Sequence, residues 1–384
     1  MRILFAADMS LNFIPAIEDR AAVEAIMGDT AQVFRSSDFS VVNQENIFGS
    51  EDAYSPIVKS GPNLISDPST AAFLDVLAPT VVGFANNHTG DFGPEAMFDT
   101  MAMIRERGML PIGAGANLEE AYQPAILEKD GIKVAVIAVC ENEFGTAGEN
   151  TPGSAGYRLG MLTGAIRKAR ERGELPIVYF HGGNETNPFP SVGKVELYRH
   201  FVDLGAAAVI AMHTHCPQGY EMYDGCPIVY SMGNFFFPAK WDSIPTWSLG
   251  YMAMLDITAE GITLDTIPYR FDFEHHTLLT GQEKENFDAY LQELCTPIGD
   301  PCKLSRLFDA WTVIGGLNGY VRAVNYHPEM VAEGAESVKA LKNVFSCEAH
   351  NELVKNTLKL IFEGRCADYQ EEVDYIKRLQ NVKI

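Results

Sequence analysis

Side chains able to bind metal ions follow short apolar segments at several separate places in this 384-residue chain. They comprise two carboxylates, a side-chain amide and three imidazoles: Asp8, Glu45, Asn87, His181, His213 and His215. Carboxylate with imidazole suits zinc, manganese or iron, and no thiol lies among them. Two such cations about 3.5–4 Å apart can clamp a phosphoryl group and activate a water molecule. The residue types therefore favour a dinuclear metal centre acting on a phosphoester or a related anionic bond.

Taken singly, these residues have ordinary structural explanations. An isolated Asp or Asn at a strand end more often caps a helix or a turn. By itself Glu45 would be a solvated acid, and His181 would be structural. The pair His213 and His215 is stronger, because packing would place neither imidazole at the end of an apolar strand. Their joint occurrence after successive strands favours a metal site.

Short apolar segments alternate with amphipathic ones through the first two thirds of the chain. The former predict strands at 2–7, 39–42, 80–85, 133–139, 177–180 and 207–211. The latter predict helices at 69–77, 95–107, 162–172 and 194–204. This alternation indicates parallel strands with helical connections. Such strands would deliver the polar side chains to one edge of the sheet, where α/β proteins bind ligands.

The later segments 227–231, 250–257 and 262–269 are strand-like with no helix between them, which predicts a second, more antiparallel sheet. Helical patterns then dominate, at 283–294, 304–313, 337–345, 352–362 and 369–379. We therefore expect an α/β fold of two mixed sheets packed face to face with flanking helices over 1–280. An α-helical C-terminal region is expected over 281–384.

Composition narrows the class of protein. A formal net charge of −22 argues against nucleic-acid binding, although bound cations could still hold a small or polymeric anionic substrate. No apolar segment is long enough to span a membrane. The N-terminal apolar run is too short for a secretion signal, and the seven scattered cysteines contain no CxxC pair. These features predict a cytoplasmic protein in a reducing compartment.

The order of these motifs resembles the CapA (poly-γ-glutamate capsule synthesis) family of calcineurin-like metallophosphoesterases. The resemblance covers roughly residues 1–240. Four motifs carry it: NNHTGDFG at 86–93, HGGNE at 181–185, MHTH at 212–215 and YSMGNF at 230–235. It implies an αββα metallophosphoesterase sandwich, two divalent cations, and a role in capsule or poly-γ-glutamate synthesis.

The resemblance also implies residue roles. Asp8 and His215 would bind the first cation. The second cation would be bound by Asn87, His181 and His213. Glu45 would bridge the two cations. His88 would stabilise or protonate the leaving oxygen, and Asp91 would orient its ring. A further group is expected around the ligands or the substrate: Asn43, Asn86, Glu185, Asn234 and Lys59. From its loop alone, Lys59 is expected in a surface salt bridge.

One departure from the superfamily pattern keeps other functions open. The superfamily begins with Asp-x-His, whereas this chain has Asp8-Met9-Ser10, so the first cation lacks one protein ligand. This favours, as an alternative, a metal-stabilised, non-catalytic binding or scaffold protein for a polyanion or polypeptide. The His88 and Asp91 pair favours catalysis, since a binding protein needs no leaving-group acid. A metal-dependent amidase acting on γ-glutamyl bonds is a third possibility.

Overall fold

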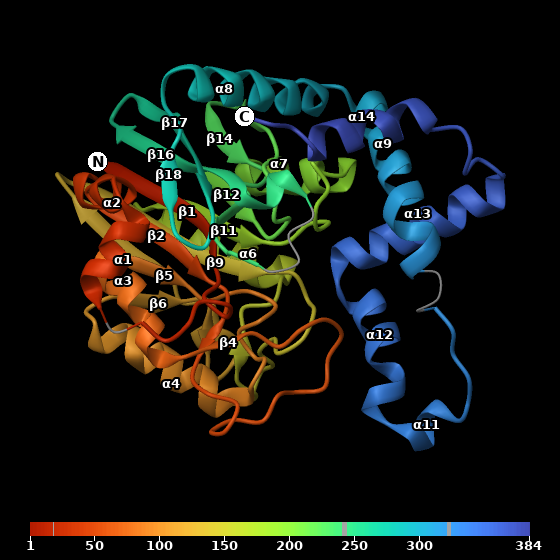
Figure 1. Ribbon diagram of the computed structural model, residues 1–384, viewed down its shortest axis with the longest axis horizontal. Coiled ribbons are helices and arrows are strands. Elements are labelled where there is room, and N and C mark those ends of the chain that lie inside the picture. Colours follow the sequence, from red (N-terminus) through yellow and green to blue (C-terminus); the bar gives the residue numbers. More distant parts are fainter. Residues whose placement is uncertain (18, 240–243, 321–323) are drawn as a thin grey trace.

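Two mixed β-sheets form the centre of the molecule, with helices on their outer faces and a further group of helices at one side (Figure 1). This computed structural model describes residues 1–17, 19–239, 244–320 and 324–384, apart from the side chains of residues 318 and 320. The predicted α/β sandwich of two mixed sheets is confirmed.

The larger sheet has eight strands within the described residues. In spatial order they are β18 (His276–Leu278), β17 (Gly261–Phe271), β16 (Leu249–Thr258), β1 (Arg2–Met9), β2 (Phe39–Gln44), β5 (Val81–Gly83) and β6 (Leu110–Ile112), with β15 (Asn234–Phe236) pairing with β1. Strands β15, β1, β2, β5 and β6 run parallel, and β16 to β18 are antiparallel additions.

The second sheet has six strands in the part of the chain that is described. Their order is β13 (Tyr220–Tyr223), β14 (Cys226–Val229), β12 (Ala208–Met212), β11 (Leu175–His181), β9 (Ile132–Cys140) and β8 (Ala125–Lys129). The inner four are parallel, and β8 and β13 are antiparallel edges. Two short pairs lie apart: β3 (Ile47–Phe48) with β4 (Ile65–Ser66), and β7 (Ala114–Gly115) with β10 (Gly153–Ser154).

The prediction that the three later segments build the second sheet is confirmed for 227–231 and wrong for 250–257 and 262–269. Strands β16 and β17 instead extend the first sheet, where Ile3 pairs with Leu255. Strand β14 joins the second sheet in parallel with β12. The reason lies in burial: β16 is buried along most of its length and so requires neighbours on both edges, which β1 and β17 supply. Strand periodicity identifies a strand but not its partner.

The two sheets pack directly on one another. The Tyr179 hydroxyl on β11 donates a hydrogen bond to the Ala6 carbonyl on β1 at 2.5 Å, and the rings of Phe5 and Tyr179 lie 5.8 Å apart. Most strand residues on both sides are fully buried and belong to one continuous apolar core. Parallel strands covered on both faces are expected to be apolar throughout, as these are.

The four predicted helices between strands are present, with ends that shift by up to three residues: the 3₁₀ turn η1 (Pro68–Ala71) leading into α3 (Ala72–Leu77), α4 (Gly93–Glu106), α6 (Leu159–Glu171) and α7 (Val192–Asp203). Three further helices of the described residues were not predicted: α1 (Arg20–Met27), α2 (Thr30–Ser36) and α5 (Leu118–Ala121). Glycines at 108, 173 and 205 follow α4, α6 and α7 with positive φ, the backbone that a helix end favours.

The C-terminal residues are helical, as predicted. The elements are α8 (Gly281–Cys295), η3 (Thr296–Gly299), α9 (Pro301–Trp311), the π-helical η4 (Thr312–Tyr320), α11 (Met330–Glu333), α12 (Ala335–Ser346), α13 (Glu348–Glu363) and α14 (Gln370–Gln380). Helix α8 packs Phe287 against Tyr251 of β16, while α12 and α13 stand beside the loops at the strand ends (Figure 1). No helix among the described residues is long and apolar enough to cross a membrane.

Candidate metal centre

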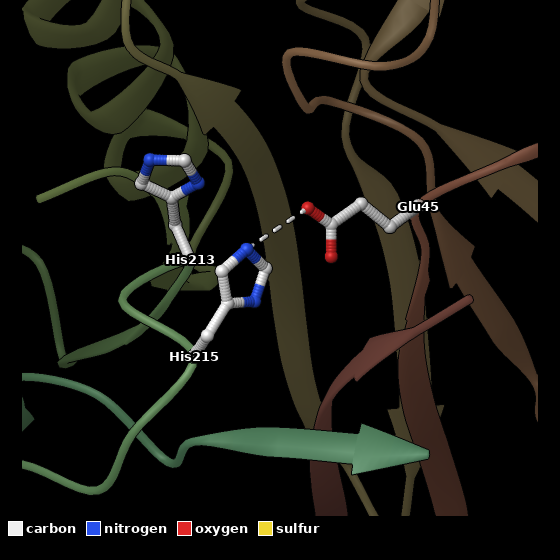
Figure 2. Close-up of side chains that lie close together, drawn as sticks. All are labelled: Glu45, His213 and His215. Carbon is white, nitrogen blue, oxygen red and sulfur yellow. Dashed lines mark ion pairs between the residues drawn. The ribbon is translucent and has the colours of Figure 1, made fainter. Parts of the chain in front are cut away.

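The polar side chains predicted from strand ends do meet at the junction of the two sheets. Asp8 lies near the end of β1 and His181 ends β11, so the two central parallel strands meet here. The turn after β12 supplies His213 and His215. These two residues face Glu45, which lies in the loop after β2 (Figure 2). The carboxyl ends of parallel strands are where α/β sheets assemble their sites.

His181 is surrounded by acceptors. Its Nε2 atom lies 3.0 Å from Asn87 Oδ1, 3.0 Å from His213 Nδ1 and 3.7 Å from Glu45 Oε1. A ring nitrogen carries at most one proton, so it can donate to only one of them. Four ligand-type atoms therefore crowd together with too few protons between them. A cation among these atoms would satisfy them all.

Glu45 gives the strongest sign of a missing charge. Its side chain is fully buried, and neither carboxylate oxygen has a hydrogen-bond partner among the described residues. The nearest cation-forming groups are imidazoles, with His215 Nε2 at 3.9 Å from Oε1 (Figure 2). Ligand atoms of Glu45, His213 and His215 all lie within 4.8 Å of one another. A buried charge requires a partner, so the donor set fits a divalent cation.

The directions of the pKa shifts are consistent with a cation site at these residues. Burial, followed by repulsion from Asp8 and Glu185, raises the pKa of Glu45 well above its ordinary value. Burial would also raise the pKa of Asp8, but the neighbouring His181 outweighs it and the pKa is lowered. Burial and the adjacent His181 and His215 hold the pKa of His213 well below its usual range. Its imidazole is therefore neutral, as a metal ligand must be.

Asp8 ties the two sheets together at this point. Its Oδ1 accepts a hydrogen bond from Asn43 Nδ2 at 2.8 Å and lies 3.2 Å from His181 Nδ1. Its Oδ2 accepts from the backbone N–H of His213 at 2.8 Å. From a strand of the first sheet, the carboxylate thus contacts the His181 ring and holds the backbone of His213.

The turn that carries the two histidines has unusual backbone conformations. His213 and His215 have φ values of 96° and 54°, in the left-handed region that non-glycine residues rarely adopt. His215 Nδ1 contacts Asn234 Oδ1 at 2.8 Å, and its ring lies 4.6 Å from that of Trp247. These contacts leave Nε2 turned toward Glu45. Strain of this kind is characteristic of functional sites.

His88 sits in a second group of polar contacts. Its Nδ1 lies 2.7 Å from Asp91 Oδ2 and 3.1 Å from Lys59 Nζ, and Lys59 is also ion-paired to Asp91. Burial and the Lys59 ammonium lower the pKa of His88. The expectation of a surface salt bridge for Lys59 is wrong: the residue is 6% exposed, because the loop over 57–64 folds back onto Asp91.

The remaining predicted residues surround the ligands in different ways. Asn86 donates to Asn43 Oδ1 at 3.2 Å and accepts from the backbone N–H of His88 at 3.0 Å, so it links two loops. Asn234 holds His215, as described above. Glu185 is exposed and lines the neighbouring cavity. The Ser10 hydroxyl donates to Asn12 Oδ1 at 2.9 Å.

Glu143 was not predicted, yet it lies at the same site. It is 7% exposed, with Oε1 at 3.9 Å from His213 Nε2. It follows β9 just as Asp8 and His181 end their strands, so the strand-end rule could have found it. It lines a cavity of about 310 Å³ together with His88 and Asn87. Residues of α12 and α13 close that cavity, and no sequence signal pointed to them.

Close backbone packing fixes this cavity. Gly90 and Gly145 meet so tightly that a Cβ atom on Gly90 would lie 2.7 Å from the Gly145 Cα. The loop that carries His88 and the loop that carries Glu143 are therefore held side by side. The glycine of the NNHTG motif is therefore required by packing, because any side chain there would collide with the neighbouring loop.

The sequence profile of the bacterial capsule synthesis protein PGA_cap family matches residues 5–239. The chain belongs to this family. The matched range contains every predicted ligand, and the family lies within the calcineurin-like metallophosphoesterases that the motifs indicated.

Curated relatives agree with the assignment. The chain is 26% identical over 241 residues to the PGA biosynthesis protein CapA of Bacillus subtilis, covering 62% of this chain and 63% of that protein. It is 30% identical over 168 residues to the capsule biosynthesis protein CapA of Bacillus anthracis, covering 42% and 41%. The chain thus spans less than two thirds of the length of either relative.

Among solved structures, TT1561 of Thermus thermophilus aligns with a TM-score of 0.37 at 14% identity, covering 69% of this chain and 98% of that chain. So loose a superposition adds nothing to the topology, which rests on the strand order and pairing described above.

Proposed function

We propose that this chain is a metal-dependent hydrolase with a dinuclear centre, acting on a phosphoester or a related anionic bond. The observation that carries the proposal is the fully buried carboxylate of Glu45, whose oxygens have no hydrogen-bond partner among the described residues. Its neighbours are imidazoles and carboxylates, which are ligands for manganese, iron or zinc.

We assign the ligands to two cations as the family resemblance implies. Asn87, His181 and His213 cluster around the Nε2 atom of His181 and would hold one cation. Asp8 and His215 would hold the other, and Glu45 lies within 4 Å of both His181 and His215, where it can bridge. When bound, two such cations supply positive charge to phosphoryl oxygens and acidify a water molecule.

His88 is the group placed to act on the leaving oxygen. Asp91 holds its Nδ1, which leaves Nε2 as the ring nitrogen available to a substrate in the cavity that His88 lines. Lys59 adds a positive charge beside it. A ring fixed in this way can stabilise or protonate a developing alkoxide.

The relatives suggest a biological setting. Two of them are named for capsule or PGA biosynthesis, and we propose that the hydrolytic activity of this chain serves such a process, with a small or polymeric anion as substrate.

The test combines metal content with hydrolysis of bis(p-nitrophenyl) phosphate, with and without manganese. The wild-type protein is expected to bind metal and turn over, and His88→Ala to keep its metal but lose about 10²–10⁴-fold in rate. His213→Ala is expected to lose metal. His200→Ala, an exposed histidine on α7, is the matched control and should change neither. Unchanged metal content in His213→Ala would refute the ligand assignment.

One observation favours a non-catalytic binding or scaffold role instead. Ser10 stands where the superfamily has a histidine ligand, and its hydroxyl is engaged with Asn12, so the first cation is held by fewer protein groups. Full metal occupancy without turnover of any ester would select this alternative.

A further inference from the structure

The cavity beside His88 has two walls of different origin. One wall belongs to the loops of the metal centre: Lys59, Asn87, His88, Glu143 and Glu185. The facing wall comes from the C-terminal helices: Ala340, Asn343, Val344 and His350. The family profile ends at residue 239, so the second wall lies outside the part of the chain that the family profile matches.

The helical wall is firmly attached to the metal side. Asn343 Nδ2 on α12 donates to Glu143 Oε2 at 3.3 Å, and the Lys342 ammonium donates to the Glu143 backbone carbonyl. The Glu348 carboxylate at the start of α13 accepts from the Asn142 backbone at 2.9 Å and from its amide at 2.7 Å. The wall is therefore a built part of the site, held against residues 142–143 that follow β9.

The two walls offer different chemistry. The metal side presents the His88 imidazole and the Lys59 ammonium, which is paired with Asp91, and these suit an anion and its leaving oxygen. The carboxylates of Glu143 and Glu185 line the same wall. The helical side presents the apolar Ala340 and Val344 together with the Asn343 amide and the His350 imidazole. The Asn343 Oδ1 atom is buried and has no hydrogen-bond partner among the described residues. An organic group with a hydroxyl or N–H donor would complement this wall.

The size of the cavity limits that organic group. Sites for small molecules enclose about 300–1,000 Å³, and this cavity of about 310 Å³ is at the lower end. A single ring-sized group therefore fits within it. Because His88 lies in the cavity lining, the group held there is the one attached to the leaving oxygen.

We propose that α12 and α13 select the leaving group: the substrate is a small anionic ester whose ring-sized organic part lies between His88 and the Ala340 face of α12. The position of the anion rests on the proposed function, but the recognition of the organic part does not require turnover.

Binding to the manganese-loaded protein tests the proposal by calorimetry, with phenylphosphonate and methylphosphonate as hydrolysis-resistant probes of similar charge. Phenylphosphonate is expected to bind at least tenfold more tightly. Ala340→Phe places a ring in the cavity from an exposed position, so the fold is spared. The substitution should lower the affinity for phenylphosphonate at least tenfold and change the affinity for methylphosphonate less than twofold. Ala335→Phe, on the same helix and also exposed but outside the cavity, should change neither.

Two results would overturn the proposal: equal affinity of the wild-type protein for both probes, or an equal loss of both in Ala340→Phe. The outcomes also separate it from the proposed function. Selective binding of phenylphosphonate without hydrolysis of any ester would reject the hydrolase and retain the helical selectivity wall. Hydrolysis of esters without tighter binding of phenylphosphonate would retain the hydrolase and reject the helical selectivity wall.

Discussion

Two buried clusters that contain acidic residues lie close together in this protein. They differ in whether the chain provides a partner for the buried carboxylate. The metal pocket consists of Glu45 and the five other predicted ligands. The anchor cluster consists of Glu141, Asn142, Lys194 and Glu348, where α13 meets the body. In the anchor cluster Glu141 is ion-paired to Lys194 and accepts a backbone hydrogen bond from Gly183 at 3.3 Å. In the metal pocket Glu45 has no such partner among the described residues.

The difference shows how to separate a structural acid from a ligand. Burying a carboxylate is costly unless an opposite charge accompanies it. Burial alone would lower the pKa of Lys194, but its neighbours, Glu141 first among them, outweigh burial and raise the pKa, so Lys194 keeps its charge. Among the described residues the fold pairs no equivalent cation with Glu45. A cation from outside the chain would complement its carboxylate, and we propose a metal ion in that role.

The largest expected effect breaks the anchor cluster. Lys194→Met leaves Glu141 buried without its cation and should lower the free energy of unfolding by about 3–5 kcal/mol, measured by urea denaturation. Lys339→Met removes a surface pair with Glu336 and serves as the control, with a change of about 0.5 kcal/mol or less. Equal losses in the two variants would contradict the distinction between the clusters.

Removing the metal tests the other side of the comparison. With manganese at about 100 times its Kd, the wild-type protein should gain about 2.7 kcal/mol of stability over the chelated protein. Glu45→Gln should lose this gain, because the bridging carboxylate is gone. Lys194→Met should keep the full gain from its lower starting point. A manganese-dependent gain in Glu45→Gln equal to that of the wild type would mean that Glu45 binds no metal.

The smallest expected effect concerns a histidine that is buried but needs no cation. His276 Nδ1 contacts Thr30 at 2.8 Å and Nε2 contacts the Phe235 carbonyl at 3.0 Å, and burial lowers its pKa to about 3. The unfolded chain therefore binds the extra proton first, with a pKa near 6.5. Stability from this residue is complete above pH 6.5 and is lost progressively as the pH falls toward 3.

Between pH 7 and pH 5 that loss amounts to about 2 kcal/mol. Urea titrations at the two pH values measure how far the free energy of unfolding falls from pH 7 to pH 5. This fall should be smaller in His276→Gln than in the wild type by about that amount. His275→Gln, its exposed neighbour, should fall as the wild type does. Identical falls in wild type and His276→Gln would show that the residue is not buried in its neutral form.

Much of the site was predictable because it depends on local pattern. Asp8, His181 and the His213–His215 turn each follow an apolar strand, and the periodicity of a strand shows where it ends. Glu143 obeys the same rule after β9 and could have been found. The burial of Lys59 could not, because it depends on a loop folding back onto Asp91. Nothing local in residues 340–350 indicates that they line the cavity.

The sequence by itself determined the longer strands and helices, the family, and which polar residues stand at strand ends. These follow from side-chain period and residue type along a short stretch of chain. Only the tertiary structure decided that β16 and β17 extend the first sheet, that Glu45 is left without a partner among the described residues, and that α12 closes the cavity. Those depend on whole faces packing against one another across hundreds of residues, and no local pattern encodes them.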